Sequence, residues 1–323
     1  MTTLLILAYN EEKTVGALID KLSKEFNYII LIDDNSSDKT QSIVKKYTEN
    51  KNFIYHKNEK NLGAGKSFEK GVHIFNELNS EYLLKIDGDA QFKIEDIKKI
   101  KNLGIKEKFD FIKGDRFWEN GIEGKIPFIR YFGNALASFL IKLSTGNWKI
   151  NDPLNGLFFI SKKAALGFSL SKLFNRYGYP FYLVTYISNK SKSTHIKFGQ
   201  YQNTIIYGNE RSDLKANVML FKLLYFTFVS FYKKIKTKMK YSNLQFSALI
   251  DILAHFFLAF SIFSFYKLVS IRYYSSEGPQ GSWFLVATLF MSMFFILLSL
   301  SQKTENNSES NELIIIKNKW KNY

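Results

Sequence analysis

Residues 83–92 read LLKIDGDAQF, an apolar run that ends abruptly in two carboxylates and an amide. The run has the length and the Leu/Ile content of a strand buried on both faces of a parallel sheet. Similar runs fill the first third of the chain, namely TLLILA (3–8), YIILID (28–33), NFIYH (52–56) and FDFIKG (109–114). Helical patterns lie between them at 13–26, 39–47 and 66–78. This alternation predicts an α/β fold with a mostly parallel open sheet flanked by helices, in which ligands bind beyond the carboxyl ends of the strands.

The composition excludes several classes of protein. The 323 residues are 46% hydrophobic and 17% aromatic, so the chain can bury a core, which argues against a disordered or collagen-like polymer. There are no cysteines, which removes disulfide frameworks, zinc–cysteine sites, iron–sulfur clusters and thiol nucleophiles, and makes a reducing compartment the natural setting.

The formal net charge of +16 is distributed unevenly. Residues 1–210 carry a net +8, residues 211–240 carry +7, and residues 241–323 carry only +1. A basic excess indicates either nucleic acid or an anionic membrane surface as partner. Because the lysines at 233–240 directly precede an apolar segment, we expect a membrane surface and no nucleic acid.

The middle of the chain gives weaker signals. Residues 127–143 predict an amphipathic helix, which either packs on the sheet or lies at a membrane interface. GLFFIS (156–161) and HIKF (195–198) are interpreted as strands, and residues 172–188 as a helix between them.

Two C-terminal segments are long enough to cross a bilayer, which takes about 20 apolar residues. They cover 246–271 and 283–300, and the short turn-rich segment between them predicts a transmembrane hairpin. The lysines before the first span, against the single Arg272 in the loop, place residues 1–240 and the tail in the cytoplasm by the positive-inside rule. Asp251 and His255, near the start of the first span, either face each other or are ordinary flanking residues.

A third apolar segment, 218–232, has only fifteen residues, and we interpret it as an interfacial helix rather than a third span. No signal peptide is expected before the first strand. The predicted organisation is a cytoplasmic catalytic domain at 1–212, an interfacial helix with a basic collar at 213–240, a transmembrane hairpin at 241–302 and a cytoplasmic tail at 303–323.

Four polar clusters follow four of the predicted strands. The first two are AYNEE (8–12) and IDDNSSDKT (32–40), which are either capped turns, with Ser36, Ser37 or Asp38 as helix cap, or hydrogen-bond acceptors for a nucleoside. The third, KNLGAGKSFEKG (60–71), lacks the spacing of a Walker A loop. Its Gly63 and Gly65 either admit a close neighbour or make a turn, and Lys66 is either a diphosphate contact or a solvated lysine.

The fourth cluster, DGDAQ, is the most specific. It puts Asp87, Asp89 and the amide of Gln91 within one turn, and oxygen ligands of this kind suit Mg²⁺ or Mn²⁺ held jointly with substrate phosphates. The alternative is a turn with two caps.

Together these motifs resemble family 2 glycosyltransferases of the A-type fold, and within them the polyprenyl-phosphate glycosyltransferases of the dolichol-phosphate mannosyltransferase kind, over about residues 1–210. The resemblance implies nucleotide contacts at Ala8, Tyr9, Asn10, Glu12, Asp33, Asp34, Gly63, Lys66 and Asp87, and a metal site at Asp87, Asp89 and Gln91. It implies catalytic roles for Asp89, Arg116 and Arg211, and acceptor or sugar contacts at Arg130, Asn134, Asp152, Asn155, Gly156 and Lys215.

The implied activity is metal-dependent, inverting transfer of a sugar from a UDP- or GDP-linked donor to undecaprenyl or dolichyl phosphate at a membrane, with self-association open. A phosphate acceptor is already an oxyanion and needs no general base. One alternative is transfer to a hydroxyl acceptor in polysaccharide or glycolipid synthesis, although the QxxRW element of processive synthases is missing. A second alternative is a non-catalytic membrane accessory protein, against which the intact DGDAQ argues.

Overall fold

The computed structural model describes residues 1–118, 121–123, 128–191, 194–206, 216–240, 245–274, 279–308 and 314–316. Its contacts divide the chain into two compact units, Met1–Thr227 with Asn311–Tyr323, and Phe228–Ser310. Each unit is described by itself.

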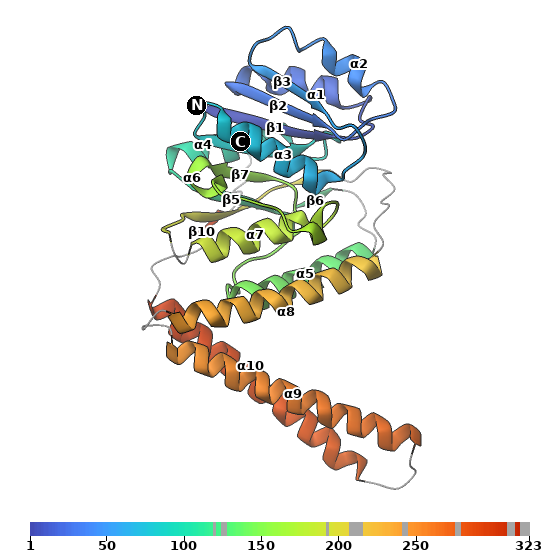
Figure 1. Cartoon of the computed structure of the whole chain (residues 1–323), viewed down its shortest axis with the longest axis vertical. Helices are drawn as coiled ribbons and strands as arrows, with labels where there is room; N and C mark the ends of the chain where they lie inside the picture. The colour runs from blue at the N-terminus through green and yellow to red at the C-terminus, as the bar shows by residue number, and fades with distance from the viewer. Residues whose placement is uncertain are drawn as a thin grey trace. The chain divides into compact units, whose positions relative to one another are not determined.

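The first unit is built on an eight-stranded sheet in the order β10-β8-β5-β7-β4-β1-β2-β3 (Figure 1). Every neighbouring pair is parallel except those that β7 makes with β4 and β5. The strands are β1 Thr2–Ala8, β2 Tyr28–Asp33, β3 Phe53–Lys57, β4 Tyr82–Asp87, β5 Phe111–Asp115, β7 Phe158–Ser161, β8 Phe198–Gln202 and β10 Ile314–Ile316. A two-stranded sheet pairs β6 Ile122–Glu123 with β9 Ile205–Ile206.

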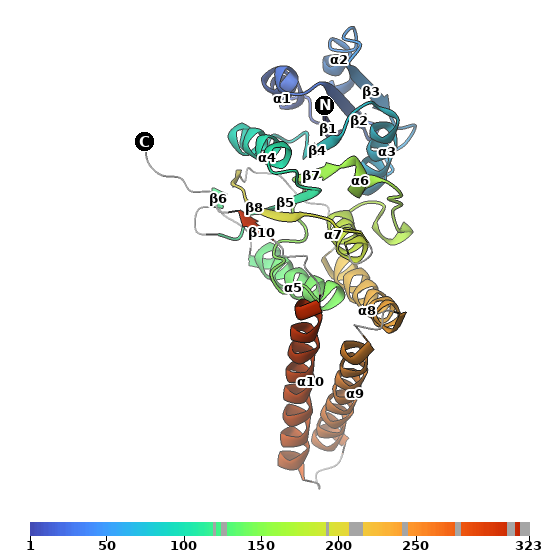
Figure 2. The same ribbon diagram turned by 90° about the vertical axis from the view of Figure 1, so that its left-hand side faces the viewer.

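Helices cover both faces of the large sheet, because alternate strand residues point to opposite sides. In β1, Leu5 and Leu7 join the core under one set of helices, whereas Leu4 and Ile6 join the core under the other. The first set is α3 Ala64–Glu77, α5 Phe128–Thr145, α7 Tyr179–Lys190 and the start of α8 Ala216–Lys240. The second set is α1 Val15–Leu22, α2 Thr40–Lys45 and α4 Ile94–Lys106 (Figure 2). Short helical turns complete the unit at η1 Ser23–Glu25, α6 Lys162–Ala165 and η2 Lys172–Phe174.

The fold class predicted from the sequence is therefore confirmed, and the first five strands fall within two residues of their predicted positions. Two later expectations were wrong in detail. The strand expected at 195–198 begins only at Phe198, where β8 pairs with β5. The helix expected over 172–188 forms only from Tyr179, because Gly178 takes a left-handed conformation (φ 79°) and Pro180 occupies the first turn.

The tail contains a strand that the sequence did not predict. Ile314–Ile316 pairs in parallel with Gly199–Tyr201 of β8, and Ile316 packs against the core. A run of three isoleucines is too short to predict a strand from the sequence. It forms one here because it pairs with the edge of β8.

The second unit contains the rest of α8 and two long helices, α9 Gln245–Tyr274 and α10 Gln280–Ser308, which run side by side (Figures 1 and 2). Both are long and apolar enough to cross a membrane, over Gln245–Tyr273 and Gln280–Ser301. Only 33% and 22% of their most apolar windows are buried, unlike core helices of a soluble protein. At one end of the pair, Lys238 Nζ lies 2.7 Å from Asp251 Oδ2 and 2.8 Å from Ser247 Oγ, all three buried.

Candidate active site

The order of strands reverses between β1 and β4, since β2 and β3 lie on one side of β1 and every later strand lies on the other. The loops that follow these two strands are in contact at this point. Gly88 N donates to Leu7 O at 2.8 Å, and Thr14 Oγ1 donates to Gly88 O at 2.7 Å. In open α/β sheets such a switch point beyond the carboxyl ends is where ligands bind. AYNEE and DGDAQ, 75 or more residues apart, are thus brought together there.

The loops after β1 and β2 are joined by hydrogen bonds in both directions, since Asn10 N also donates to Ser36 Oγ at 2.9 Å. Ser37 N donates to Asn10 Oδ1 at 2.9 Å, and Lys39 N donates to Glu12 Oε2 at 3.0 Å. Ala8 is buried at the end of β1, whereas Tyr9 is 47% exposed. Asn10 and Glu12 therefore shape the loop, and the side chain of Tyr9 stays accessible to solvent.

Asp33 and Asp34 are both buried, and the chain itself supplies donors to both. Asp33 accepts from Ser36 N at 2.7 Å and from Tyr55 Oη at 2.9 Å. Asp34 accepts from Leu62 N, Gly63 N and Asn58 Nδ2 at 2.7 to 2.8 Å. These donors offset the repulsion between adjacent carboxylates. Asp34 therefore holds the third loop against the second.

The glycines of the third loop admit a neighbouring segment of backbone. A Cβ added at Gly65 would stand 2.1 Å from Phe174 O, and one at Gly63, where φ is +91°, would stand 2.7 Å from Arg176 Cα. Gly65 N also donates to Arg176 O at 3.1 Å. The two glycines therefore admit a close neighbour, and that neighbour is the backbone of residues 174–176 of the same chain. Lys66 pairs with Glu69 at 2.6 Å and stays partly exposed.

The DGDAQ turn projects from β4. Asp87 Oδ1 lies 2.6 Å from Lys85 Nζ, and Asp89 Oδ1 accepts from Gln91 N at 3.1 Å. Ala90, with φ 57°, makes the turn. Among the described residues no group of three or more His, Asp or Glu side chains gathers as a metal site. The oxygen donors of Asp87, Asp89 and Gln91 fit a hard divalent ion that completes its coordination with phosphate oxygens.

Directly after β5, Arg116 forms a buried bidentate pair with Asp152. Arg116 Nη2 lies 2.9 Å from Asp152 Oδ1, Nε lies 3.0 Å from Oδ2, and the backbone N of Arg116 also donates to Oδ2 at 3.0 Å. Asn155 Nδ2 adds a further donor at 3.0 Å, and Asn134 Oδ1 lies 3.5 Å from Arg116 Nη2. Both carboxylate oxygens of Asp152 are thus occupied by this network.

Glycines let the two halves of the site approach each other. A Cβ on Gly156 would stand 2.4 Å from Asp87 Oδ2, so the DPLNG segment lies directly against the DGDAQ aspartate. A Cβ on Gly114 would stand 2.5 Å from Asn203 Oδ1, and Asn203 Oδ1 accepts from Asn155. The antiparallel pairing of β7 with β4 produces the first of these contacts.

Burial shifts the pKa values of several ionisable groups beside the network of Arg116 and Asp152. Desolvation lowers the pKa of Lys113, which is fully buried, to about 8, although the charges of Asp152 and Asp115 oppose the shift. Desolvation raises the pKa of Asp115, whose Oδ2 accepts from Gln200. Burial, followed by the charges of Asp87 and Asp89, raises the pKa of Tyr179 well above its usual value. Perturbed groups of this kind gather at functional sites.

Three predicted residues cannot be placed fully. Arg211 and Lys215 lie outside the described residues, and Arg130 lies in α5 with a side chain that is outside them too. Conversely, sequence reasoning missed Lys85, Lys113, Tyr179 and Asn203. Lys85 and Lys113 could have been found from the sequence, because each is a lysine inside an apolar strand run, LLKID and FIKGD.

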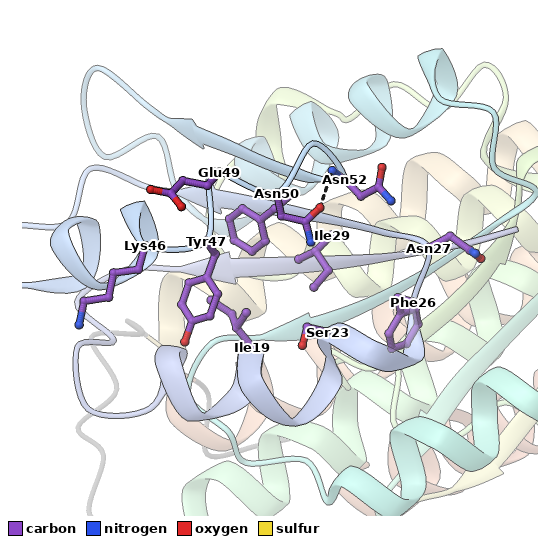
Figure 3. A pocket seen from close by; sticks show the side chains of 11 residues that line it. Ile19, Ser23, Phe26, Asn27, Ile29, Lys46, Tyr47, Glu49, Asn50 and Asn52 are labelled. Atoms are coloured by element: carbon purple, nitrogen blue, oxygen red, sulfur yellow. Dashed lines mark hydrogen bonds between the residues drawn. The ribbon is translucent and has the colours of Figure 1, made fainter.

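A separate cavity of about 390 Å³ lies at the opposite, amino-terminal ends of β2 and β3 (Figure 3). Ile19, Tyr47 and Phe53 contribute its apolar wall, and Asn50 Oδ1 accepts from Asn52 N at its rim. No residue of the candidate active site lines it.

The fold is an open, mostly parallel α/β sheet whose candidate site lies beyond the carboxyl ends of β1 and β4, where the strand order reverses. The sequence profile of Glycosyl transferase family 2 matches residues 3–166, half of the chain, and the chain belongs to this family.

Two kinds of named relative share the domain. The UDP-N-acetylglucosamine–dolichyl-phosphate N-acetylglucosaminyltransferase of Methanococcus voltae is 30% identical over 176 residues, covering 50% of this chain and 69% of that protein. A poly-beta-1,6-N-acetyl-D-glucosamine synthase of Staphylococcus epidermidis is 31% identical over 172 residues, covering 50% and 39%. The chain spans 63% and 60% of two uncharacterised proteins of Methanocaldococcus jannaschii, at 28% and 34% identity.

A solved structure with the same fold is glucosyl-3-phosphoglycerate synthase of Mycobacterium tuberculosis, in complex with Mn²⁺, UDP and glucosyl-3-phosphoglycerate. Its TM-score is 0.52 at 14% identity, over 71% of this chain and 79% of that one. The similarity extends to the fold, which is the A-type glycosyltransferase fold predicted from the sequence.

Proposed function

We propose that this protein is a membrane-bound inverting glycosyltransferase that moves a sugar from a UDP- or GDP-linked donor to a polyprenyl phosphate, undecaprenyl or dolichyl, with Mg²⁺ or Mn²⁺. The observation that carries the proposal is the presence, in one chain, of a family 2 domain with DGDAQ at the switch point and of two apolar candidate spans. The dolichyl-phosphate relative from M. voltae supports the same class of acceptor.

The state of Asp152 favours a phosphate acceptor. A hydroxyl acceptor needs a general base, which must reach the proton with an available lone pair. Asp152 instead accepts hydrogen bonds from Arg116 and Asn155 on both carboxylate oxygens and is fully buried. A lipid phosphate, already an oxyanion, needs only cationic residues to bind and orient it.

Exposed apolar faces on two helices of the first unit support a position at the membrane surface. In α5 the exposed residues recur at helical spacing, and the start of α8 repeats the pattern. They are Phe128, Tyr131, Phe132 and Phe139 in α5, and Val218, Phe221, Leu224 and Tyr225 in α8. The exposed lysines at the end of α8, Lys233, Lys236 and Lys240, add attraction for anionic lipid, so we propose that these faces bring the site to the headgroups.

The pairing of β10 with β8 supports the two-span topology. Residues on both sides of the apolar helices, Phe198–Gln202 and Ile314–Ile316, belong to one sheet. The chain between them must therefore cross a membrane an even number of times. With α9 and α10 as the two spans, an even number of crossings supports the interfacial interpretation of 218–232 over a third span.

In the proposed reaction the acceptor phosphate attacks the anomeric carbon in line, the bond to the donor diphosphate breaks, and the configuration inverts. A bound Mg²⁺ or Mn²⁺, held by Asp89, Gln91 and Asp87, would neutralise charge on the departing diphosphate. Asp33, Asp34, Asn10 and Glu12 hold the nucleoside loops in shape, and Tyr9 offers the base a stacking face. Arg116, fixed by Asp152, orients phosphate oxygens, and we keep Arg130, Arg211 and Lys215 as proposed contacts of the lipid phosphate.

The test uses membranes containing the full chain, a radiolabelled nucleotide sugar, polyprenyl phosphate and Mn²⁺. We expect labelled lipid with at least one common UDP- or GDP-sugar, and loss of it in Asp89→Ala. If no sugar nucleotide gives labelled lipid, or if Asp89→Ala retains full activity, the proposal is wrong.

The topology can be tested cleanly because the chain has no cysteine. Single cysteines at Ser42, on the surface of the first unit, and at Ser276, between the candidate spans, can be labelled from either side of sealed vesicles. We expect opposite sidedness for the two positions. Labelling of both from the same side would contradict the hairpin.

The relative from S. epidermidis favours a second candidate, transfer to a sugar hydroxyl in polysaccharide synthesis. Supplying oligosaccharide acceptors in the same assay separates the two, because a hydroxyl acceptor would give labelled glycan without labelled lipid. Binding of UDP or GDP that depends on Mn²⁺ would argue against a non-catalytic accessory protein.

A further inference from the structure

A buried lysine lies beneath the first aspartate of DGDAQ. Lys85 and Asp87 are two residues apart on β4, so their side chains share one face of the strand. Lys85 is fully buried, and its Nζ lies 2.6 Å from Asp87 Oδ1. The rings of Tyr179 and Phe158 lie 5.4 and 5.8 Å from the ammonium. Burying a charge among aromatic rings costs free energy, and the ion pair with Asp87 offsets part of that cost.

The ammonium is closed off from the substrate side by Gly156. A Cβ there would stand 3.1 Å from Lys85 Nζ and 2.4 Å from Asp87 Oδ2. Lys85 thus cannot touch a substrate directly, and its charge acts through Asp87, whose side chain keeps 34% of its exposure. One oxygen of Asp87 is therefore held by Lys85 before any ligand arrives.

We propose that Lys85 is a positioning residue that fixes Asp87 and offsets its charge, so that the DGDAQ site takes up a divalent cation only together with a nucleoside diphosphate. This inference rests on the proposed function, because it assumes a cation at Asp89. With Asp87 paired to Lys85, the two aspartates and the lysine carry a net charge of about −1, too little for a hard dication that prefers several anionic oxygens. The diphosphate supplies the missing charge.

The inference predicts strong coupling between cation and nucleotide. In the full chain in detergent, Mn²⁺ binding is measured by electron paramagnetic resonance with and without UDP or GDP. We expect the wild type to bind Mn²⁺ weakly alone and at least about tenfold more tightly with the nucleotide it prefers. In Lys85→Met, Asp87 is freed, and we expect Mn²⁺ alone to bind on the order of tenfold more tightly than to the wild type.

Two further variants separate charge from folding. Lys85→Arg keeps the cation and should keep the coupling of the wild type. Lys85→Gln removes the charge but can still donate a hydrogen bond to Asp87, and it should bind Mn²⁺ alone on the order of tenfold more tightly than the wild type. Lys101→Met, which removes a mostly buried lysine paired with Glu25 on another face, should lower stability and leave Mn²⁺ binding unchanged.

The outcomes distinguish this inference from the proposed function. If the wild type binds no Mn²⁺ even with UDP or GDP, the cation site of the proposed function fails, and the inference with it. If the wild type shows coupling but Lys85→Met binds Mn²⁺ alone no more tightly, only the inference is overturned. Should Lys85→Met fail to fold, Lys85→Gln is measured in its place, and Mn²⁺ binding alone that is no tighter than that of the wild type overturns the inference.

Discussion

Gly156 lies against Asp87 so closely that a Cβ on the glycine would stand 2.4 Å from Asp87 Oδ2. This contact joins DPLNG, on the predicted acceptor side, to DGDAQ, on the donor side. Even the smallest side chain must therefore displace the carboxylate or separate β7 from β4.

We accordingly expect Gly156→Ala to lower nucleotide binding and transferase activity by at least about tenfold, because a displacement near 1 Å at a reacting site is costly. Gly133→Ala is the matched control, since nothing lies within 4 Å of its Cβ in α5. It should keep activity and gain up to about 1 kcal/mol in stability from helix propensity. Equal activity in the two variants would contradict the role given to Gly156. Calorimetric titration with UDP or GDP and the lipid-labelling assay measure the two effects.

Asp152→Asn should destabilise the first unit by about 3 to 5 kcal/mol, because it leaves the buried guanidinium of Arg116 without its counter-charge. Activity should fall through loss of orientation of Arg116. If Asp152 were a general base, activity would fall with a changed pH profile at high acceptor concentration; on our interpretation the profile keeps its shape. Chemical denaturation and pH–rate profiles of the same variant separate these two results.

Asp251→Asn should destabilise the helical hairpin by about 3 to 5 kcal/mol, since Lys238 is fully buried and paired with it. Lys238→Met combined with Asp251→Leu should recover most of this loss, because no unpaired charge stays buried. Lys236→Met, exposed on the same helix, should change thermal unfolding little. A double variant as unstable as Asp251→Asn would argue against the pair as the source of the effect.

Lowering the pH should weaken the ion pairs that Glu25 makes with Lys98 and Lys101. Hydrogen bonds from Lys101 and Lys98 lower the pKa of Glu25 from 4.5 to about 2. Because the folded-state pKa is the lower one, the stabilisation is present above pH 4.5 and is lost as the pH falls towards 2. Thermal unfolding should show that the difference between wild type and Glu25→Gln narrows over this range. A difference that stays constant from pH 6 to pH 2.5 would contradict this assignment.

The fold class follows from local sequence patterns alone, because five buried strand runs alternating with amphipathic helices admit few arrangements other than a mostly parallel sheet. It also located DGDAQ and AYNEE at strand ends and the two apolar segments by length alone. These signals are local, since each depends on residues within about 20 positions of one another.

Contacts between residues far apart in the chain supply the features that the local patterns leave open. The third loop's glycines admit the backbone of Phe174 and Arg176, the charge beneath Asp87 comes from Lys85, and Arg116 meets Asp152 across 36 positions. Only the free edge of β8 turns Ile314–Ile316 into a strand. Each of these depends on side chains or edges brought together by the sheet order, and contacts between distant positions leave no periodic signal in one sequence.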